Sequence, residues 1–212
     1  MALRKRTITQ KVVKRAQKLG VKVYERNQWG SKYNKVYHKR RKTRPVRVKK
    51  ASLLVVHITV TKDTGLGDAS FFSDMRTIER IGIERFGSGV SYNFCIDNSR
   101  GYVGVGQALD AKGTHTVNNR GVRGYPYDLN HFARAIAWIA MPGDQFKFAA
   151  RDSMVRLIAA MVLEGALTEN FEIAPHSKFA AKDCPTDAVR KELVDIKSDA
   201  VRLARQERAN YG

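Results

Sequence analysis

The chain has 212 residues, of which 43% are hydrophobic and 28% are charged, and its formal net charge at pH 7 is +19. This length suits one domain with a sizeable core. No run of about 18 apolar residues exists, so the sequence predicts no membrane-spanning helix. The two cysteines are too few for a disulfide framework, and the first ten residues lack the apolar segment of a secretory signal. Both observations indicate synthesis in a reducing cytoplasm.

The positive charge is concentrated near the N-terminus. Residues 1–50 contain 19 of the 39 Lys and Arg residues but one of the 20 acidic residues, Glu25. The rest of the chain is close to neutral. A segment of this kind attracts polyanions such as nucleic acid, anionic lipid or a cell wall that carries phosphate and carboxylate polymers. It is equally consistent with a solvated tail that keeps the protein soluble, and charge alone does not choose among these.

The first predicted element is a basic helix over Ile8–Leu19, which has a narrow apolar stripe and Gly20 as its C-cap. We predict a boundary after this helix, with residues 1–20 as a basic helical arm and residues 21–212 as the main domain. We expect the main domain to fold without the arm. Residues 31–50 show no clear period and predict a surface loop.

Strands and helices are predicted to alternate along the main domain. The continuous apolar run Leu53–Thr61 is typical of a strand that is buried on both faces. Ser91–Ile96 and Tyr102–Val105 flank a turn and indicate a hairpin. The remaining predictions are an extended Val21–Tyr24, a buried strand His131–Ile139, and helices over Ala69–Phe86, Asp152–Leu167 and from Thr186 or Asp187 to Leu203. This pattern predicts an α/β fold, with a mixed central β-sheet flanked by helices.

Three residues form a candidate zinc site. His57 lies in the apolar run, whereas His176 and Cys184 are eight positions apart near the C-terminus. His57 alone fits a core histidine, but the three together favour a ligand set. Three protein ligands leave the fourth tetrahedral position open, as in a catalytic zinc site. Such an ion lowers the pKa of bound water to about 7 and polarises a carbonyl, so hydrolysis is the leading reaction class.

The order of motifs resembles that of the zinc-dependent N-acetylmuramoyl-L-alanine amidases, a family that contains amidase-type bacteriophage lysozymes and the peptidoglycan recognition proteins. The resemblance covers roughly residues 21–203. Its motifs are Arg26–Gly30, Val55–Thr59, Tyr92–Ile96 with Gly101, Gly113–Thr116, His176 with Lys182, and Asp183–Pro185. Two departures are Thr186, where the family often has Gly, and the long segment Val117–Asn130, which could alter the groove.

The resemblance implies a reaction and the residues that perform it. The substrate it implies is the amide that joins the lactyl group of N-acetylmuramic acid to L-alanine in peptidoglycan. One zinc ion is expected on His57, His176 and Cys184. Lys182 is the predicted cation that stabilises the oxyanion, and Tyr92 is predicted to orient water or donate to that oxyanion. No Glu in a motif of its own identifies the proton shuttle.

Three further residues are predicted to bind substrate. Trp29 belongs to the first family motif, and His115 and Thr116 belong to the Gly-x-His-Thr motif. His115 is predicted as a groove residue and not as a zinc ligand. Cys95 is expected to be a small buried hydrophobe within its strand.

The expected role is that of a bacteriophage endolysin, which is made in the host cytoplasm and acts at the cell wall after release. We expect a monomer whose basic arm attracts anionic wall polymers. A virion-associated lysin and a cytoplasmic amidase that recycles muropeptides are alternatives. A further alternative is a non-catalytic peptidoglycan-binding module of the same fold. Such members typically lack the zinc cysteine, whereas Cys184 is present here.

A second class is a nucleic-acid-binding protein. Its basis is the basic N-terminal segment, in which Tyr24, Trp29, Tyr33 and Tyr37 could stack on bases. The excess of positive charge ends where the amidase motifs begin, so the sequence favours the amidase.

Overall fold

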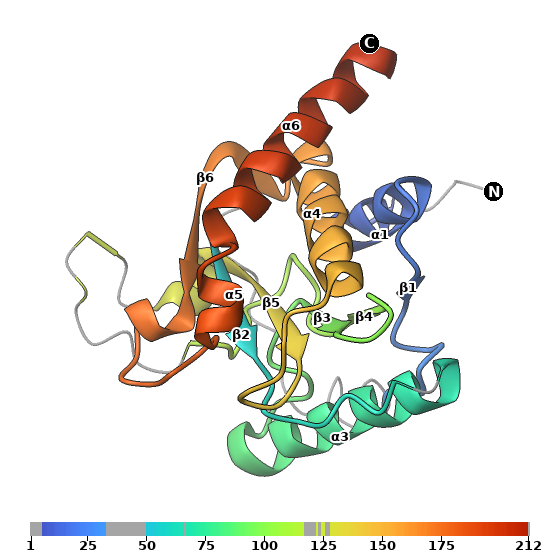
Figure 1. The fold of residues 1–212 in the computed structure, drawn as a ribbon, viewed down its shortest axis with the longest axis vertical. Coiled ribbons are helices and arrows are strands. Elements are labelled where there is room, and N and C mark those ends of the chain that lie inside the picture. The colour runs from blue at the N-terminus through green and yellow to red at the C-terminus, as the bar shows by residue number, and fades with distance from the viewer. Residues whose placement is uncertain are drawn as a thin grey trace.

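A six-stranded mixed sheet with helices on both faces organises the molecule (Figure 1). The computed structural model describes residues 6–32, 50–65, 67–116, 122, 124–125 and 128–211. The strands are β1 (Val23–Tyr24), β2 (Ala51–Ile58), β3 (Phe94–Asp97), β4 (Val103–Val105), β5 (Ala133–Ile139) and β6 (Leu167–Pro175). Their order is β1-β4-β3-β5-β2-β6, and of the strand pairs in the described residues only β3 and β4 run antiparallel. The predicted fold class is confirmed.

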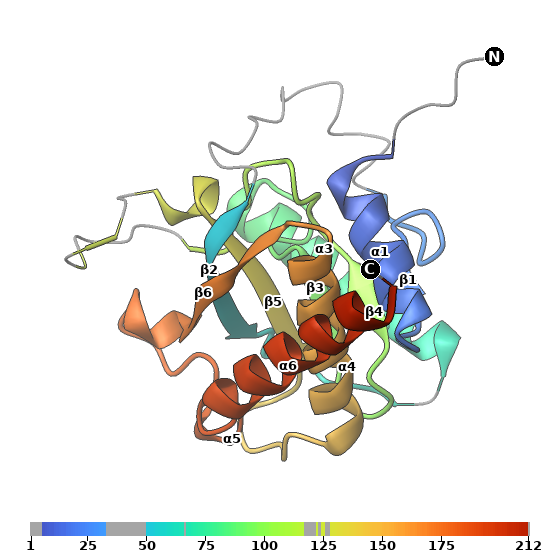
Figure 2. The ribbon, with the colours of Figure 1, turned by 90° about the horizontal axis from the view of Figure 1, so that it is seen from above.

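Helices cover the two faces of the sheet unequally. They are α1 (Ile8–Lys18), α3 (Asp68–Phe86), α4 (Phe148–Leu163), α5 (Asp187–Arg190) and α6 (Leu193–Tyr211), with short 3-10 turns η1 (Leu129–His131) and η2 (His176–Lys178). Figure 2 shows α4 and α6 on one side of the sheet and α3 on the other. Side chains alternate along β5, so both faces of the sheet are apolar. Ile136 and Trp138 belong to the larger apolar cluster with α4, whereas Ala137 and Ile139 belong to the smaller cluster with α3. No helix in the described ranges is long and apolar enough to cross a membrane.

The ends of α1 are determined by local sequence. A capping box begins it: Thr7 Oγ1 accepts a hydrogen bond from the Gln10 amide at 3.3 Å, and Gln10 Oε1 accepts one from the Thr7 amide at 3.0 Å. Gly20 follows the helix with a φ of 87°, in the left-handed region where a side chain would be strained.

The apolar face of α1 is part of the main core. Val12 and Ala16 have no exposed surface, and they belong to the apolar cluster that contains α4. Arg15 also forms an ion pair with Glu164, the C-cap residue of α4, at 3.0 Å. The division at residue 20 into a basic arm and a main domain stays a prediction, which a truncated chain can test. The boundary at residue 20 divides the charge, but the packing continues across it.

Deleting residues 1–20 is expected to destabilise the domain instead of leaving it intact. The deletion would expose the part of α4 that Val12, Val13 and Ala16 cover. Each fully buried large apolar side chain contributes about 1.5–3 kcal/mol, so we expect the free energy of unfolding to fall by about 3 kcal/mol or more. Urea denaturation of the full chain and of a chain that begins at Val21 measures this. Lys14→Ala, a change at an exposed position of the same helix, is the control and should leave the midpoint unchanged. Equal midpoints for the full and truncated chains would support an arm that folds independently of the domain.

The C-terminal third differs from prediction in two places. The helix predicted over Asp152–Leu167 begins earlier and ends at Leu163, after which Gly165 turns the chain with a φ of 74°. The following strand β6 was not predicted, because it is a sheet edge whose residues are mostly part-exposed and do not form an apolar run. The predicted last helix is divided into α5 and α6. The other predicted strands and helices are confirmed within a few residues.

Candidate metal centre

The ends of β2 and β6 bring two histidines together. These strands are parallel, and Val56 is paired with Pro175, so His57 and His176 follow at adjacent positions. Their ring centroids are 4.4 Å apart. Neither the sheet register nor the strand β6 was available from the sequence pattern. The tertiary structure therefore supplies the reason why these two histidines meet.

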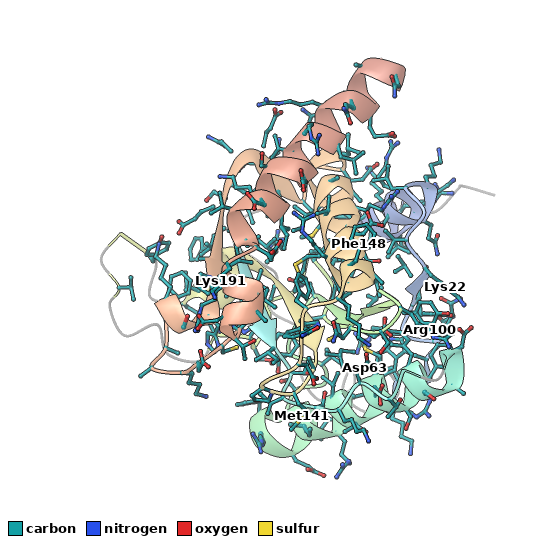
Figure 3. The ribbon with its side chains drawn as sticks, viewed as in Figure 1. Lys22, Asp63, Arg100, Met141, Phe148 and Lys191 are labelled. Carbon is teal, nitrogen blue, oxygen red and sulfur yellow. The ribbon has the colours of Figure 1, made fainter. Side chains whose placement is uncertain are left out.

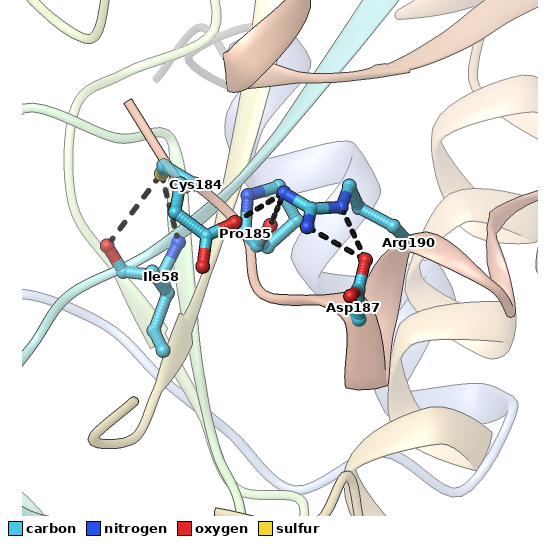
Figure 4. Close-up of polar contacts among 6 residues, drawn as sticks. Ile58, Cys184, Pro185, Asp187 and Arg190 are labelled. Carbon is cyan, nitrogen blue, oxygen red and sulfur yellow. Dashed lines mark hydrogen bonds and ion pairs between the residues drawn. The ribbon is translucent and has the colours of Figure 1, made fainter. Parts of the chain in front are cut away.

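The loop after η2 returns Cys184 to the same place. The Ser177 amide donates a hydrogen bond to the Cys184 carbonyl at 2.6 Å, which closes the loop. The Ile58 amide donates to Cys184 Sγ at 3.4 Å (Figure 4). An amide aimed at sulfur stabilises negative charge on it, which suits a thiolate ligand better than a neutral thiol.

The three side chains fit a zinc ion. Their ligand atoms all lie within 4.8 Å of one another, and Cys184 Sγ is 3.9 Å from His57 Nδ1. Tetrahedral zinc with ordinary Zn–N and Zn–S bonds places neighbouring ligand atoms about 3.3–3.7 Å apart. The observed set is slightly wider than this, so a small inward movement of side chains would complete it. Two imidazoles and one thiolate form a donor set that zinc favours.

Burial lowers the pKa of both histidines, which favours the neutral imidazoles that can bind a metal. The pKa of His57 lies well below its ordinary value because burial, and then the charges of His176 and His115, disfavour the imidazolium. Burial, followed by the charge of Lys182, lowers the pKa of His176 to about 4. Both rings are thus neutral at neutral pH, as a ligand must be. Among the described residues, no hydrogen-bond partner meets the buried His57 Nε2.

Tyr92 and Lys182 lie beside these three residues, and their parts in the chemistry stay predictions. The Tyr92 ring is 4.9 Å from the ring of His57, and burial raises the pKa of its phenol. Tyr92 therefore keeps its proton at neutral pH and can donate a hydrogen bond. Lys182 is exposed, and its charge adds to burial in lowering the pKa of His176. Burial raises the pKa of the Cys184 thiol, and the charge of Lys182 opposes this rise only in part. Its carbonyl accepts a hydrogen bond from the Cys184 amide at 3.0 Å.

His115 borders the centre, but Thr116 is held elsewhere. The His115 ring lies 5.4 Å from that of His57, and neither of its nitrogens has a hydrogen-bond partner among the described residues. Burial is the main cause that lowers the pKa of His115 to about 3. Thr116 is 4% exposed, and its amide and hydroxyl both donate to Asn130 Oδ1, at 3.0 and 3.3 Å. Thr116 thus braces the segment that carries His115, and its contact with substrate stays a prediction.

Trp29 is a packing residue. Its side chain has no exposed surface and lies in the apolar cluster beneath α3. The indole Nε1 donates to the Val105 carbonyl at 3.1 Å. The structure therefore corrects the prediction that Trp29 binds substrate, because a ring without accessible surface cannot reach it. Cys95 is likewise fully buried, as expected. Tyr33 and Tyr37, proposed for base stacking, lie outside the described residues.

Sequence reasoning missed Arg190, which binds the turn around Cys184. Its Nη1 donates to Asp183 and, at 2.9 Å, to the Pro185 carbonyl (Figure 4). Its Nε and Nη2 donate to Asp187 Oδ1 at 3.0 and 2.6 Å. The spacing of three residues between Asp187 and Arg190 on a predicted helix was the available signal.

Comparisons with known proteins agree with this geometry. The sequence profile described as N-acetylmuramoyl-L-alanine amidase matches residues 47–187. This span includes His57, His176 and Cys184. No curated protein sequence matches the chain.

Solved structures of peptidoglycan recognition proteins (PGRPs) share the fold. PGRP-SA of Apis mellifera aligns with a TM-score of 0.67 at 16% identity, over 82% of this chain and 95% of that one. Drosophila PGRP-LB aligns with a TM-score of 0.64 at 16% identity, over 84% and 94%. Human PGRP-IBETAC, solved in complex with glycosamyl muramyl pentapeptide, aligns with a TM-score of 0.62 at 23% identity, over 78% and 90%.

Proposed function

The chain belongs to the N-acetylmuramoyl-L-alanine amidase family, and from this premise we propose that it hydrolyses peptidoglycan with one zinc ion. The bond cleaved is the amide between N-acetylmuramic acid and L-alanine. The observation that carries the proposal is the convergence of His57, His176 and Cys184 from three separate segments. A site that only bound peptidoglycan would not require a cysteine beside two neutral imidazoles.

The side chains around the ligands have separate tasks in this proposal. The zinc ion supplies a Lewis acid and a water molecule of lowered pKa. Tyr92, protonated at neutral pH, donates a hydrogen bond to the scissile carbonyl oxygen as negative charge develops on it. The Lys182 ammonium stabilises the same charge from the exposed side of the centre. His115, whose ring lies 5.4 Å from that of His57, orients the substrate by a hydrogen bond from an imidazole nitrogen.

Mass spectrometry of purified peptidoglycan digested by the protein tests the reaction. Free stem peptides with a new L-Ala amino terminus would support the proposal. Binding of the protein to peptidoglycan whose stem peptides stay attached would support a binding module. Two of the similar PGRP structures were solved in complex with a peptidoglycan fragment. Cleavage at a different bond would refute the assigned substrate.

We also propose a lytic role as a bacteriophage endolysin that acts as a monomer at the host cell wall. Its support is the proposed reaction together with the strongly basic composition. Expression in a bacterial host together with a membrane-permeabilising protein tests this role. Rapid lysis that requires Cys184 is the expected result.

The outer face of α1 is proposed to bind anionic wall polymer. Lys11, Lys14 and Lys18 are exposed, and none has an acidic partner among the described residues. The neighbouring Lys22 (Figure 3) differs, because its ammonium donates a hydrogen bond to Asp68 Oδ1 at 2.8 Å. Since the apolar side of α1 is buried, these three charges are held at a fixed place on the surface.

Replacing Lys11, Lys14 and Lys18 by Gln is expected to weaken binding to purified walls several-fold at low salt. The difference should vanish at high salt, because exposed charges are screened beyond about 10 Å at 0.1 M. Co-sedimentation with walls measures it, and the same change at Arg80, Arg85 and Lys191 is the control. Equal binding by both triple variants would contradict a specific role for α1. Retention on DNA with a steep salt dependence, and none on walls, would favour nucleic acid.

A further inference from the structure

Arg190 is placed to hold the proposed zinc ligand Cys184 in position. Cys184 lies between two residues that the same guanidinium binds, the side chain of Asp183 and the carbonyl of Pro185. The peptide bond between Cys184 and Pro185 is cis. Figure 4 shows Arg190 reaching across this turn from α5. Among the described residues, Cys184 has no ion pair or side-chain hydrogen bond with Arg190, so Arg190 positions the sulfur through the backbone. Burial raises the pKa of the Cys184 thiol, and the charge of Arg190 opposes that rise in part.

The guanidinium is itself fixed before it meets the turn. Asp187 Oδ1 accepts from both Nε and Nη2, so the planar group presents its remaining nitrogen to the turn in one orientation. Only 28% of the Arg190 side chain is exposed, whereas its two carboxylate partners are about 70% exposed. Asp187 thus orients Arg190, and Arg190 holds the backbone on both sides of Cys184.

The opposite side of the cysteine is held by β2. The Ile58 amide is 3.4 Å from Cys184 Sγ, and the Cys184 carbonyl accepts from the Ser177 amide at 2.6 Å. Without Arg190, the segment from Lys182 to Pro185 would keep its backbone hydrogen bonds, the contact with β2 and the apolar packing of Cys184. It would lose the guanidinium that binds both Asp183 and Pro185. We expect the sulfur then to be less firmly held within reach of His57 and His176.

We propose that Arg190 is a positioning residue that sets the affinity and geometry of the metal centre through the turn around Cys184. This inference rests on the proposed zinc-dependent function. Loss of an outer partner of a metal ligand costs about 10–100-fold in metal affinity, and Arg190→Ala should fall in that range. Arg190→Lys should recover part of the loss, because an ammonium can reach one acceptor but cannot form the planar fork.

The test measures zinc affinity by chelator competition in the full chain, together with the absorption spectrum of the cobalt-substituted protein. Arg190→Ala should weaken zinc binding about 10-fold or more and shift the thiolate-to-cobalt band. Lys191→Ala removes a charge from the adjacent, exposed position and should leave both unchanged (Figure 3). Asp187→Asn, which frees the guanidinium, should lower affinity less than Arg190→Ala. It also serves as the second variant if Arg190→Ala fails to fold.

A further measurement does not depend on zinc. In the metal-free protein, iodoacetamide should alkylate Cys184 several-fold faster in Arg190→Ala than in the wild type, because the turn is released. Cys95, which has no exposed surface, reports on global unfolding. Wild-type affinity and alkylation rate in Arg190→Ala would overturn the inference while leaving the proposed function intact. A wild-type protein that binds no zinc would refute the proposed function, and the alkylation rates would still decide whether Arg190 holds the turn.

Discussion

Replacing Cys184 by Ser is expected to abolish both zinc binding and amidase activity. The change exchanges a thiolate for a hydroxyl that stays protonated at neutral pH, so two neutral imidazoles remain as ligands. The loss of zinc affinity should exceed the roughly 10–100-fold that removal of an outer partner costs. Zinc content by elemental analysis and release of stem peptides from peptidoglycan measure the two effects.

Cys95→Ser is the matched control for this substitution. Cys95 is fully buried in β3 and is not a member of the ligand set. It should keep one zinc ion per chain and lose stability only, because a hydroxyl is placed in an apolar environment. If Cys184→Ser instead keeps full zinc occupancy and full turnover, the ligand assignment is wrong.

Replacing Tyr92 by Phe or Lys182 by Ala is expected to slow turnover about 100-fold or more while zinc content stays complete. Each change removes one donor or charge that stabilises the developing oxyanion. Neither side chain is a metal ligand, and Lys182 is exposed, so the melting temperature should stay near that of the wild type. Steady-state cleavage of a soluble muropeptide, zinc analysis and thermal denaturation give the three readouts.

Tyr102→Phe is the control for loss of a phenol hydroxyl. Its hydroxyl meets Lys22 and Arg100 at 3.5 Å, on the side of the molecule next to β1. Its removal should leave turnover unchanged. Unchanged turnover in both Tyr92→Phe and Lys182→Ala would show that these residues only pack or solvate the site. A fall in zinc content in either variant would assign it a structural role in the metal centre.

Local patterns were sufficient for most of the elements. The apolar run of β2, the hairpin of β3 and β4, and the helical stripes of α1 and α3 follow from side-chain periodicity, which depends on neighbours in the chain. The candidate ligands were also readable, because His57, His176 and Cys184 occur in motifs of fixed order. Tyr92 and Lys182 were proposed in the same way, and in the structure Tyr92 lies next to His57 while the charge of Lys182 acts on His176.

Contacts between distant segments were not readable. The basic residues of α1 suggested a solvated arm, but the apolar stripe of this helix packs on α4. The charge on the exposed face of a helix does not show what its apolar face contacts. Trp29 carries a family motif, yet its burial beneath α3 depends on packing with residues more than forty positions away. The contact of Arg190 with the turn around Cys184 depends on how this turn folds against the start of α5.

The sequence by itself determined which residues could bind zinc, through motifs, and where most strands and helices form, because periodicity acts over short distances. The tertiary structure decided which of those residues meet. The parallel register of β2 and β6 sets His57 beside His176, and the loop closed by Ser177 returns Cys184 to them. Register and loop closure depend on the burial of whole faces of the sheet, which no local window of sequence contains.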